Sequence, residues 1–551
     1  MQKYGELLMA LLAKRGITEE RDAETFFTPD YERDLHDPFL MKDMERACVR
    51  IFEAMEAKEK IAIYADYDCD GIPGAVILRD LFKLANYENY EIYIPQRNSE
   101  GYGLNHSALE ELKSRGVKLV ITIDLGITAV SEVAQAEVDG MDIIITDHHL
   151  PPEILPRAFA ILNPKTDDYP EKMLCGAGVA FKLAQGFLKK YGEYFKVKSG
   201  AEKWMLDMAG LATLSDRVPL LGENRAISYF GMVVLRKSPR LGLQKLLAKM
   251  NIDQKYLTED DIGYMVTPRL NAASRMDDPM RAFELLSTED SAQAGVLADH
   301  LTKINDERKS IVTGIMREVH KKFEAREEKK VIVIGNADWK VGVLGLVAGK
   351  ICDQYKKPVF VWGRDENNAI KGSCRSDGSV SVVELMSNSK ESFLEFGGHE
   401  QAGGFTVENE QVHFLEDILC AALEKTKKGK NIGVKQDFDL KLGLDGVNKK
   451  NWKEIEKLSP YGLANEKPVF LFEGVDVEKV RKFGKNGSGE HLEIIFNGSG
   501  KHKVPAVAFF SGLDSFQVPL IENKKVNLLA TFDLSRFRGR EELRLRIVDI
   551  M

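Results

Sequence analysis

Aspartates follow directly on three short apolar runs within the first 150 residues, and this pattern constrains the fold more than any other feature of the chain. The acidic segments are Asp66-Tyr-Asp68-Cys-Asp70, Asp124, Asp147-His148-His149 and, after a helical stretch, Asp216. Carboxylates held close together at the ends of buried strands repel one another and resist desolvation unless positive charge compensates them. We therefore interpret the segments as a site for two divalent cations.

Residues 61 to 165 alternate β-rich runs with helical stretches, which predicts an α/β fold with a parallel sheet covered by helices on both faces. The expected strands are 61–65, 90–95, 118–123, 141–146 and 158–162. In such sheets ligands bind beyond the carboxyl ends of the strands. Acidic residues that are 80 positions apart can therefore converge on one edge.

The bulk properties favour a multidomain protein of the cytoplasm. The chain has 551 residues, which predicts three to four domains, and a formal net charge of -8, so a nucleic-acid site would have to be a local basic patch. Its six cysteines form no CxxC pair, as expected for reduced thiols. We see no signal-peptide core and no apolar run near the ~20 residues of a membrane span, so we expect no membrane contact.

Composition shifts and charged breaks divide the chain into five expected segments. These are an N-terminal helical segment (1–55), the α/β unit described above (56–287), a connector helix (288–328), a second α/β unit (329–428) and a C-terminal barrel of the OB type (429–551). A coiled-coil dimer is the alternative for 288–328. Because Arg308 interrupts the apolar stripe and the heptads are few, we favour an intramolecular connector and a monomer.

Basic and glycine-rich segments predict contacts with phosphate. His399 stands in a glycine cluster where the backbone can approach a ligand, although a core or turn histidine has the same appearance. Arg97, Arg269, Arg275 and Arg375 are expected in loops, and surface ion pairs are the alternative for each. In the barrel, the segment 536–540 with Arg544 and Arg546 indicates strand binding, or an ordinary solvated strand face.

Six motifs in this order resemble the DHH phosphoesterase superfamily and, within it, the RecJ family of single-strand-specific 5′ to 3′ exonucleases. They are Asp66-Tyr-Asp-Cys-Asp-Gly71, Arg97-Asn-Ser-Glu-Gly-Tyr-Gly103, Thr122-Ile-Asp-Leu-Gly-Ile127, Asp147-His-His149, Asp216-Arg-Val-Pro-Leu220 and Gly397-Gly-His399. The resemblance covers nearly the whole chain. It implies a DHH domain, a connector helix, a DHHA1 domain with the Gly-Gly-His motif and an OB-like barrel.

The resemblance also implies roles for individual residues. The implied metal ligands are Asp66, Asp68, Asp70, Asp124, His148 and Asp216; the implied catalytic residues are Asp147, His148, His149 and His399; the implied substrate contacts are Arg97, Arg269, Asn271, Arg275, Ser373, Arg375, Gly397, Gly398 and His399. Carboxylates and imidazoles without thiolates suit Mn²⁺ or Mg²⁺. Asp147 is either a ligand or a group that orients a histidine. Cys69 occupies a position that is usually alanine in the family, and we expect it to point away from the ions.

The implied function is metal-dependent hydrolysis of single-stranded DNA from its 5′ end, releasing 5′-mononucleotides, in DNA repair and recombination. The alternatives are a DHH-family phosphodiesterase of short oligonucleotides or cyclic dinucleotides, a DHH pyrophosphatase and a non-catalytic replication scaffold. The barrel disfavours the first two, and the complete ligand set disfavours the scaffold. A single-strand-binding protein and a RecQ-type helicase are partners that the resemblance implies.

Overall fold

The computed structural model describes residues 4–97, 99–324, 329–426, 438–484, 491–498, 502–516, 518–536 and 540–551. The chain divides into two compact units. The large unit comprises residues 37–216 and 230–433, and the small unit comprises residues 1–36, 217–229 and 434–551. The segments 427–437 and 537–539, which hold the charged linker and part of the basic cluster expected from the sequence, lie outside the described residues.

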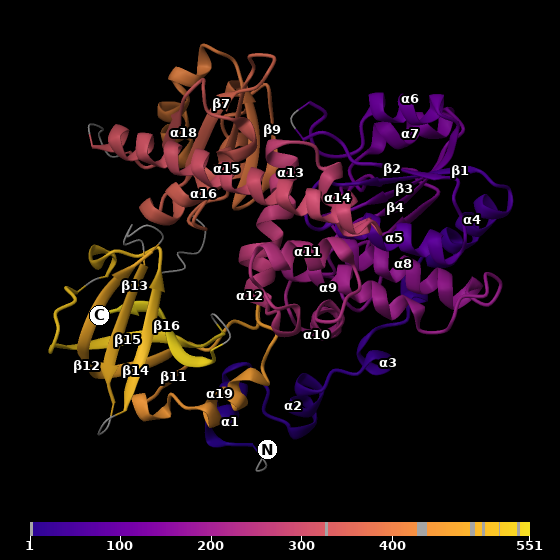
Figure 1. Ribbon diagram of the computed structural model, residues 1–551. Coiled ribbons are helices and arrows are strands. Elements are labelled where there is room, and N and C mark those ends of the chain that lie inside the picture. Colours follow the sequence, from indigo (N-terminus) through magenta and orange to yellow (C-terminus); the bar gives the residue numbers. More distant parts are fainter. Residues whose placement is uncertain are drawn as a thin grey trace. The chain divides into compact units, whose positions relative to one another are not determined.

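The first sheet of the large unit is parallel, as predicted. Its strand order is β2-β1-β3-β4-β5, with β1 Lys60–Ala65, β2 Tyr90–Tyr93, β3 Val117–Ile123, β4 Asp142–Thr146 and β5 Ala160–Leu162. Figure 1 shows α6 (His106–Ser114) and α7 (Val130–Val138) on one side of these strands, and α5 (Gly71–Leu84) and α8 (Gly176–Tyr191) on the other. The carboxyl ends of β1, β3, β4 and β5 therefore share one edge.

Burial on both faces explains why these strands are continuous apolar runs. Ala62, Tyr64 and Val120 belong to one core with residues of α6 and α7. On the opposite face α5 approaches closely, because a Cβ atom on Gly74 would lie 2.5 Å from the Ile123 side chain and 3.3 Å from Ala177 of α8. The absence of a side chain at Gly74 therefore lets α5 pack this closely against α8 and the sheet.

A helical region connects the first sheet to the connector. It comprises η2 (Ala201–Met205), α9 (Leu206–Ser215), α10 (Gly222–Leu235), α11 (Leu241–Lys249), α12 (Glu259–Asp261), a π-helical turn (Ile262–Val266), α13 (Thr267–Met276) and α14 (Met280–Ser287). From the sequence, Arg269 and Arg275 are expected in a loop, and this is wrong: both lie on α13. Its proline lies in the first turn, where a missing backbone N–H costs nothing, so the residue starts the helix instead of breaking it.

The connector is a single helix, α15 (Ser291–Phe323), and this expectation is confirmed. Its 33 residues correspond to about 50 Å. Asp290 caps the helix by accepting from the backbone N–H groups of Ala292 and Gln293. Within the large unit α15 packs against α11, α13, α14 and α16 (Leu344–Tyr355).

The second sheet of the large unit is mixed, with strand order β6-β7-β8-β10-β9. The strands are β6 Ile332–Gly335, β7 Val359–Arg364, β8 Ile370–Arg375, β9 Glu395–His399 and β10 Ala402–Val407. α17 (Val382–Ser387) and α18 (Leu415–Leu423) complete this part. Gly397, Gly398 and His399 lie in β9 at the edge of the sheet, where a Cβ atom on Gly398 would lie 2.3 Å from the Ala402 carbonyl oxygen.

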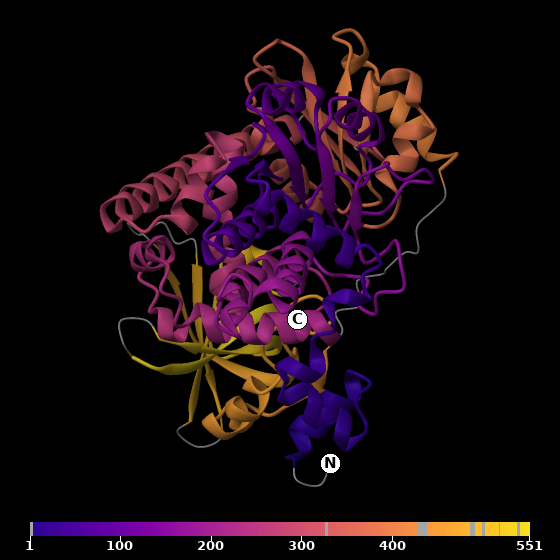
Figure 2. The same ribbon diagram turned by 90° about the vertical axis from the view of Figure 1, so that its right-hand side faces the viewer.

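The small unit is a closed barrel built together with the first helices of the chain. Its strands are β11 Leu440–Lys441, β12 Phe470–Phe483, β13 His491–Asn497, β14 Lys503–Phe509, β15 Lys525–Ser535 and β16 Glu542–Ile550. β12 pairs with β15 as well as β13, which closes the barrel and confirms the OB-like fold. Figure 2 shows the barrel in yellow and the N-terminal helices in indigo. Leu8, Leu11 and Phe26 of α1 (Glu6–Lys14) and α2 (Glu20–Phe27) share its core with Phe470 and Phe472.

Among the residues that the structure describes, none of the helices combines the length and the apolar character needed to cross a bilayer.

Candidate metal centre

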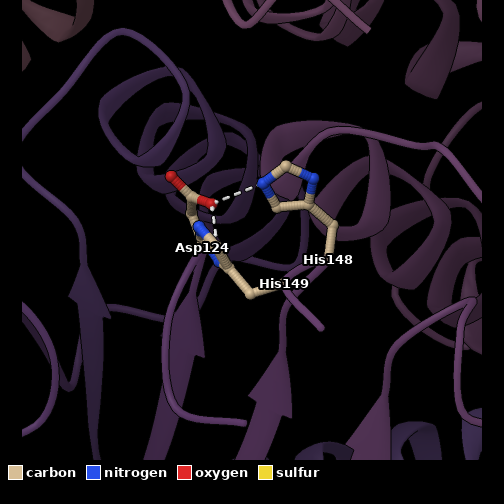
Figure 3. Close-up of side chains that lie close together, drawn as sticks. All are labelled: Asp124, His148 and His149. Carbon is tan, nitrogen blue, oxygen red and sulfur yellow. Dashed lines mark ion pairs between the residues drawn. The ribbon is translucent and has the colours of Figure 1, made fainter. Parts of the chain in front are cut away.

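Acidic and imidazole side chains from three strand ends and one helix end meet at the carboxyl edge of the first sheet. Three groups have ligand atoms within 4.8 Å of one another: Asp66, Asp68 and Asp124; Asp70, His148 and Asp216; Asp124, His148 and His149. In the third group, Oδ1 of Asp124 lies 3.1 Å from Nε2 of His148 and 3.7 Å from Nδ1 of His149 (Figure 3). The structure thus brings together every residue that the sequence proposed as a ligand.

Burial makes the anionic forms of these carboxylates costly. Desolvation, together with neighbouring aspartates, raises the pKa of Asp66 and Asp124 well above the ordinary value. The same causes raise the pKa of Asp70 to about 6 and that of Asp216 to about 9. Such a set is stable in its ionised form only when cations compensate it.

The donor set fits hard divalent cations. Oδ1 of Asp66 and Oδ1 of Asp124 are buried and have no hydrogen-bond partner within the described ranges of the chain. An imidazole nitrogen, Nε2 of His148, also lies 3.7 Å from Asp70 and 3.8 Å from Asp216. Oxygen ligands with one or two imidazoles suit Mn²⁺ and Mg²⁺. The residues present therefore fit these metals.

The backbone at Asp124 is held in an unusual conformation. Asp124 has φ +61°, a region that residues other than glycine rarely adopt and that is concentrated at functional sites. Gly176 at the start of α8 lies against it, since a Cβ atom there would be 2.5 Å from the Asp124 Cβ atom. The Tyr102 hydroxyl donates to the Asp124 carbonyl at 3.1 Å. Neighbouring elements thus fix the direction of this carboxylate.

Two of the proposed ligands also satisfy backbone donors. The Asp70 carboxylate accepts from Gly176 N at 2.6 Å and Ala177 N at 2.7 Å, which places it at the positive end of α8. Asp68 Oδ1 accepts from Asp70 N at 2.8 Å. Both residues therefore also satisfy backbone donors at a helix N-terminus, Asp68 at the start of α5 and Asp70 at the start of α8.

Asp147 and His149 form a hydrogen-bonded pair. Asp147 Oδ1 accepts from His148 N, His149 N and the His149 ring at 2.8 Å, and Asp147 Oδ2 accepts from Ile127 N. Burial alone would raise the pKa of Asp147, but the hydrogen bond and charge of His149 lower it. Asp147 in turn raises the pKa of His149 against the effect of burial. Both Asp147 oxygens are thus engaged in orienting the turn.

His148 has the properties of a neutral ligand. Burial and the neighbouring His149 lower the pKa of His148 to about 3, while the backbone carbonyl of Leu174 hydrogen-bonds its ring. A ring whose second nitrogen is held by a carbonyl presents the other nitrogen with a fixed tautomer. Nε2 is the nitrogen that faces the aspartates.

Three residues that support this edge were not selected from the sequence. Tyr102 contacts the His149 ring at 3.2 Å, Asn163 Nδ2 donates to the His149 carbonyl at 3.0 Å, and the Lys165 ammonium donates to the His148 carbonyl. Asn163 and Lys165 follow β5, the fourth strand end at this edge. Strand position was therefore the signal that could have identified them.

Arginines gather beside the acidic edge. Arg97 lies over the Tyr67 ring at 5.0 Å, and Arg275 Nη1 donates to the Gly342 carbonyl at 3.1 Å. Burial and the charges of Arg97, Arg308 and Arg375 lower the pKa of Arg275 to about 9. Arg375 Nη2 would lie 2.9 Å from a Cβ atom on Gly345, in the first turn of α16, with Ser373 Oγ at 3.5 Å. The N-terminus of α16, the donors of Arg375 and Ser373, and the space left by Gly345 together favour the binding of an anion.

The remaining predicted residues fall at different places. The rings of His399 and His149 are parallel, with centroids 6.2 Å apart, so β9 reaches the metal edge. Gly397 and Gly398 precede His399 in that strand. Arg269 and Asn271 lie on α13, with no contact to the acidic edge among the described interactions. Cys69 is buried and its thiol lies 3.4 Å from Ser215 Oγ.

Three family models and several known relatives match this chain. Residues 60–213 match the DHH family, N-terminal domain; residues 327–428 match the DHHA1 domain; residues 438–549 match the RecJ OB domain. The chain is 35% identical over 548 residues to the single-stranded-DNA-specific exonuclease RecJ of Bacillus subtilis, covering 98% of this chain and 67% of that protein. It is 29% identical over 526 residues to the Haemophilus influenzae RecJ, covering 93% and 91%.

A solved structure shows the same architecture. The crystal structure of RecJ in complex with Mn²⁺ from Thermus thermophilus superposes with a TM-score of 0.81 at 25% identity. The match covers 100% of this chain and 76% of that chain.

Proposed function

The chain belongs to the RecJ family of single-stranded-DNA-specific exonucleases, and we propose that it hydrolyses single-stranded DNA from the 5′ end with two divalent cations, Mn²⁺ or Mg²⁺. The products are 5′-mononucleotides, and the role is in DNA repair and recombination. One observation carries the proposal: a buried set of carboxylates and imidazoles is accompanied, in the same unit, by arginines and a helix N-terminus suited to phosphate.

We assign the cations to the acidic edge. Asp66, Asp68 and Asp124 would hold one ion, and Asp70, His148 and Asp216 the other, with Asp124 close to His148 as well. When bound, the ions lower the pKa of a water molecule and withdraw charge from the phosphoryl oxygens and the leaving alkoxide.

The chain's own residues orient and neutralise the substrate. Asp147 holds the His149 ring through the 2.8 Å hydrogen bond, so we assign Asp147 an orienting role. His149 and His399 present parallel rings and would donate to the scissile phosphate.

The terminal 5′-phosphate requires a separate group of donors. We assign it to Arg97, Arg275, Arg375 and Ser373, because the guanidinium fork suits bidentate contact with phosphate. Arg269, Asn271, Gly397 and Gly398 remain proposed substrate contacts.

A DHH-family phosphodiesterase of short oligonucleotides is the second candidate. It would use the same acidic edge, and Asp68 of that edge interacts electrostatically with Arg275, so contacts to the metals and to this arginine suit a small substrate equally well. The closed barrel favours the exonuclease, because barrels of this type bind single strands. The length of the preferred substrate strand is thus the property that distinguishes the exonuclease from the phosphodiesterase.

The decisive experiment compares substrates on the purified protein. Matched 5′-phosphorylated single-stranded DNA, blunt duplex, dinucleotide and pyrophosphate are each incubated with Mn²⁺, Mg²⁺ or chelator. We expect mononucleotides from the 5′ end of the single strand, with either metal and not with chelator. Hydrolysis of the dinucleotide without attack on the longer strand would replace this proposal by the second candidate.

Other expectations stay predictions from the sequence. They are the cytoplasmic location, the monomeric state, and the partnership with a single-strand-binding protein or a RecQ-type helicase.

A further inference from the structure

The motif Asp216-Arg217-Val218-Pro219-Leu220 contains four residues that the proposed reaction does not use. Asp216, the assigned metal ligand, ends α9 in the large unit, and the next residue already belongs to the small unit, which includes residues 217–229. The boundary between the two units along the chain therefore falls on the peptide bond that follows a metal ligand.

Asp216 has less support of its own than Asp70, its partner in the same ligand group. Its side chain is 28% exposed, whereas that of Asp70 is 2% exposed. The Asp70 carboxylate accepts two backbone N–H groups of α8, but within the described ranges no donor hydrogen-bonds the Asp216 carboxylate. The position of this ligand thus depends on the backbone on either side of it.

The backbone is constrained on both sides of Asp216. Before it, α9 holds the residue, since Asp216 N donates to the Ala212 carbonyl at 2.9 Å. After it, Arg217 has φ +60°, a left-handed conformation that residues other than glycine keep only where the surrounding structure imposes it. The Arg217 side chain is exposed and packs little itself. The constraint therefore comes from the segments that flank Arg217.

The small unit holds the segment that follows Arg217. Leu220 is 1% exposed, and its N–H donates to the Leu463 carbonyl at 2.8 Å. A Cβ atom on Gly462 would lie 2.7 Å from Leu220 Cδ1, so the leucine packs directly on this glycine. Glu223 Oε1 accepts from the backbone N–H of His36 at 3.0 Å. Residues 217–225 are called the clasp segment below.

Arg225 completes the hold on the clasp segment. The residue is 3% exposed, and its guanidinium lies 3.6 Å from the centroid of the Phe26 ring. It donates to the carbonyl oxygens of Phe26 at 2.9 Å and of Leu458 and Ser459 at 3.2 Å each. One side chain thus ties the clasp segment to two segments of the small unit that are distant in sequence.

The clasp segment also leads back to α9. α10 starts within it and continues into the large unit. There, a Cβ atom on Gly231 would lie 2.5 Å from the Cα atom of Gly210 in α9, and Figure 1 shows the two helices next to one another. α9, residues 216–221 and α10 therefore form a helical hairpin. Asp216 lies at the start of its turn.

We propose that the small unit positions Asp216, so that the affinity for the ion assigned to Asp70, His148 and Asp216 depends on the clasp segment. The inference rests on the proposed two-cation site. Leu220 and Arg225 are positioning residues, because they act through the backbone of Asp216. A ligand that is fixed in advance loses less conformational freedom when the ion binds. The three ligands of the other ion lie far from residue 217 in the chain, so its affinity should not depend on the clasp segment.

Titration calorimetry of the full, metal-free chain with Mn²⁺ tests this inference. Leu220→Ala removes the packing on Gly462, and Arg217→Gly frees the backbone without removing a buried contact. We expect each variant to raise the Kd of one ion about 5- to 30-fold, the effect of one additional flexible residue, and to leave the other Kd unchanged. Loss of the Arg217 charge alone would strengthen cation binding, so weaker binding has to come from the backbone.

Each variant has a matched control. Leu528→Ala removes an equally buried leucine from β15 of the same unit. Lys196→Gly replaces another exposed basic residue with positive φ, +56°, in the large unit. Both controls should bind the two ions as the wild type does, although Leu528→Ala lowers the melting temperature. If Leu220→Ala does not fold, the comparison of Arg217→Gly with Lys196→Gly decides alone.

The coupling must also act in the opposite direction, because linkage between two sites is reciprocal. Hydrogen exchange of the wild type, followed by mass spectrometry, should be slower in the clasp segment with Mn²⁺ than with chelator. The Leu220 amide reports this directly, since it donates to the Leu463 carbonyl. In Asp216→Ala the effect of Mn²⁺ on this exchange should be lost.

The outcomes separate the inference from the proposed function. If the wild type binds fewer than two Mn²⁺ ions, the two-cation site fails. If it binds two and the clasp variants match their controls, the positioning role of the small unit is refuted. Equal weakening of both ions would refute it too, as would exchange in the clasp segment that does not respond to Mn²⁺.

Discussion

At the scale of single residues, the carboxylates of the metal edge bind either protons or cations. Asp70 and Asp216 have pKa values of about 6 and about 9, raised by burial and by neighbouring aspartates, whereas an unfolded aspartate titrates near 3.9. Without metal, the protonated forms stabilise the fold below pH ~4, and this stability is lost as pH rises through 6 and then 9. Bound cations compensate the charge of the ionised carboxylates and so restore this stability.

We therefore predict that the melting temperature of the metal-free protein falls from pH 6 to pH 9. The increase that Mn²⁺ produces should become larger over the same range, because fewer protons compete for the ligands. Differential scanning calorimetry with chelator or Mn²⁺ at each pH measures this difference. A Mn²⁺ effect that is constant from pH 6 to 9 would contradict the proposed protonation of these carboxylates.

The orienting role of Asp147 gives a second prediction at this scale. Asp147→Asn should lower kcat about 10- to 100-fold, because the substituted group no longer fixes the charge and tautomer of His149. Binding of Mn²⁺ should be retained, since Asp147 is not an assigned ligand. Activity and Mn²⁺ titration calorimetry are measured together, and loss of one bound ion would make Asp147 a ligand instead.

The sequence was sufficient to predict residues whose role depends on strand ends. Asp66, Asp124 and His148 converge because parallel strands place their carboxyl ends at one edge. Asn163 and Lys165 follow the end of β5 and could have been selected on the same ground, whereas their hydrogen bonds to the His149 and His148 carbonyls leave no pattern in the sequence.

At the scale of elements, a buried ion network fixes the helices that start and end at the metal edge. Arg240 donates to Asp207 of α9 and to Asp80 of α5, both at 2.7 Å, and Ser238 also donates to Asp207. Asp207 is 1% exposed. α5 begins after Asp70, and α9 ends before Asp216.

Replacing Arg240 should destabilise this region strongly. We expect Arg240→Ala to cost about 3–5 kcal/mol of unfolding free energy, because the buried Asp207 carboxylate loses its charged partner, while the half-buried Asp80 keeps Arg79. Arg281→Ala, which removes an exposed pair with Glu284, should cost less than about 1 kcal/mol. Urea unfolding measures both variants. Equal effects would show that the network contributes no more than a surface pair.

Element boundaries were predicted less well where local signals conflict. Pro268 makes the sequence 267–275 resemble a loop. In the structure a π-helical turn precedes it, and the proline lies in the first turn of α13. The strands of the first sheet carried no such conflict, since their apolar runs are bounded by Asp, Gly and Pro.

At the scale of the whole molecule, the two ends of the chain fold together. Leu8, Leu11 and Phe26 are buried in one core with Phe470 and Phe472 of the barrel, more than 430 residues later. Arg225 stabilises this unit by donating to the carbonyls of Phe26 and Leu458. From the sequence the two ends belong to separate segments, because packing between distant parts of the chain leaves no local pattern.

Leu11→Ala should therefore destabilise the barrel itself. We expect a loss of about 2–5 kcal/mol, the usual cost of a cavity at a fully buried leucine. Proteolysis of the region 438–551 in the native protein should become faster in this variant than in an exposed control, Leu40→Ala. Unchanged protection of the barrel would contradict the shared core.

The central claim is that the acidic edge holds two catalytic cations, and metal stoichiometry tests it most directly. Equilibrium dialysis against Mn²⁺, followed by elemental analysis, should give two ions per chain for the wild type. Asp124→Asn should bind fewer ions and lose hydrolysis of single-stranded DNA, because Asp124 contributes to two of the three ligand groups. Two ions bound and full activity retained in Asp124→Asn would contradict the account.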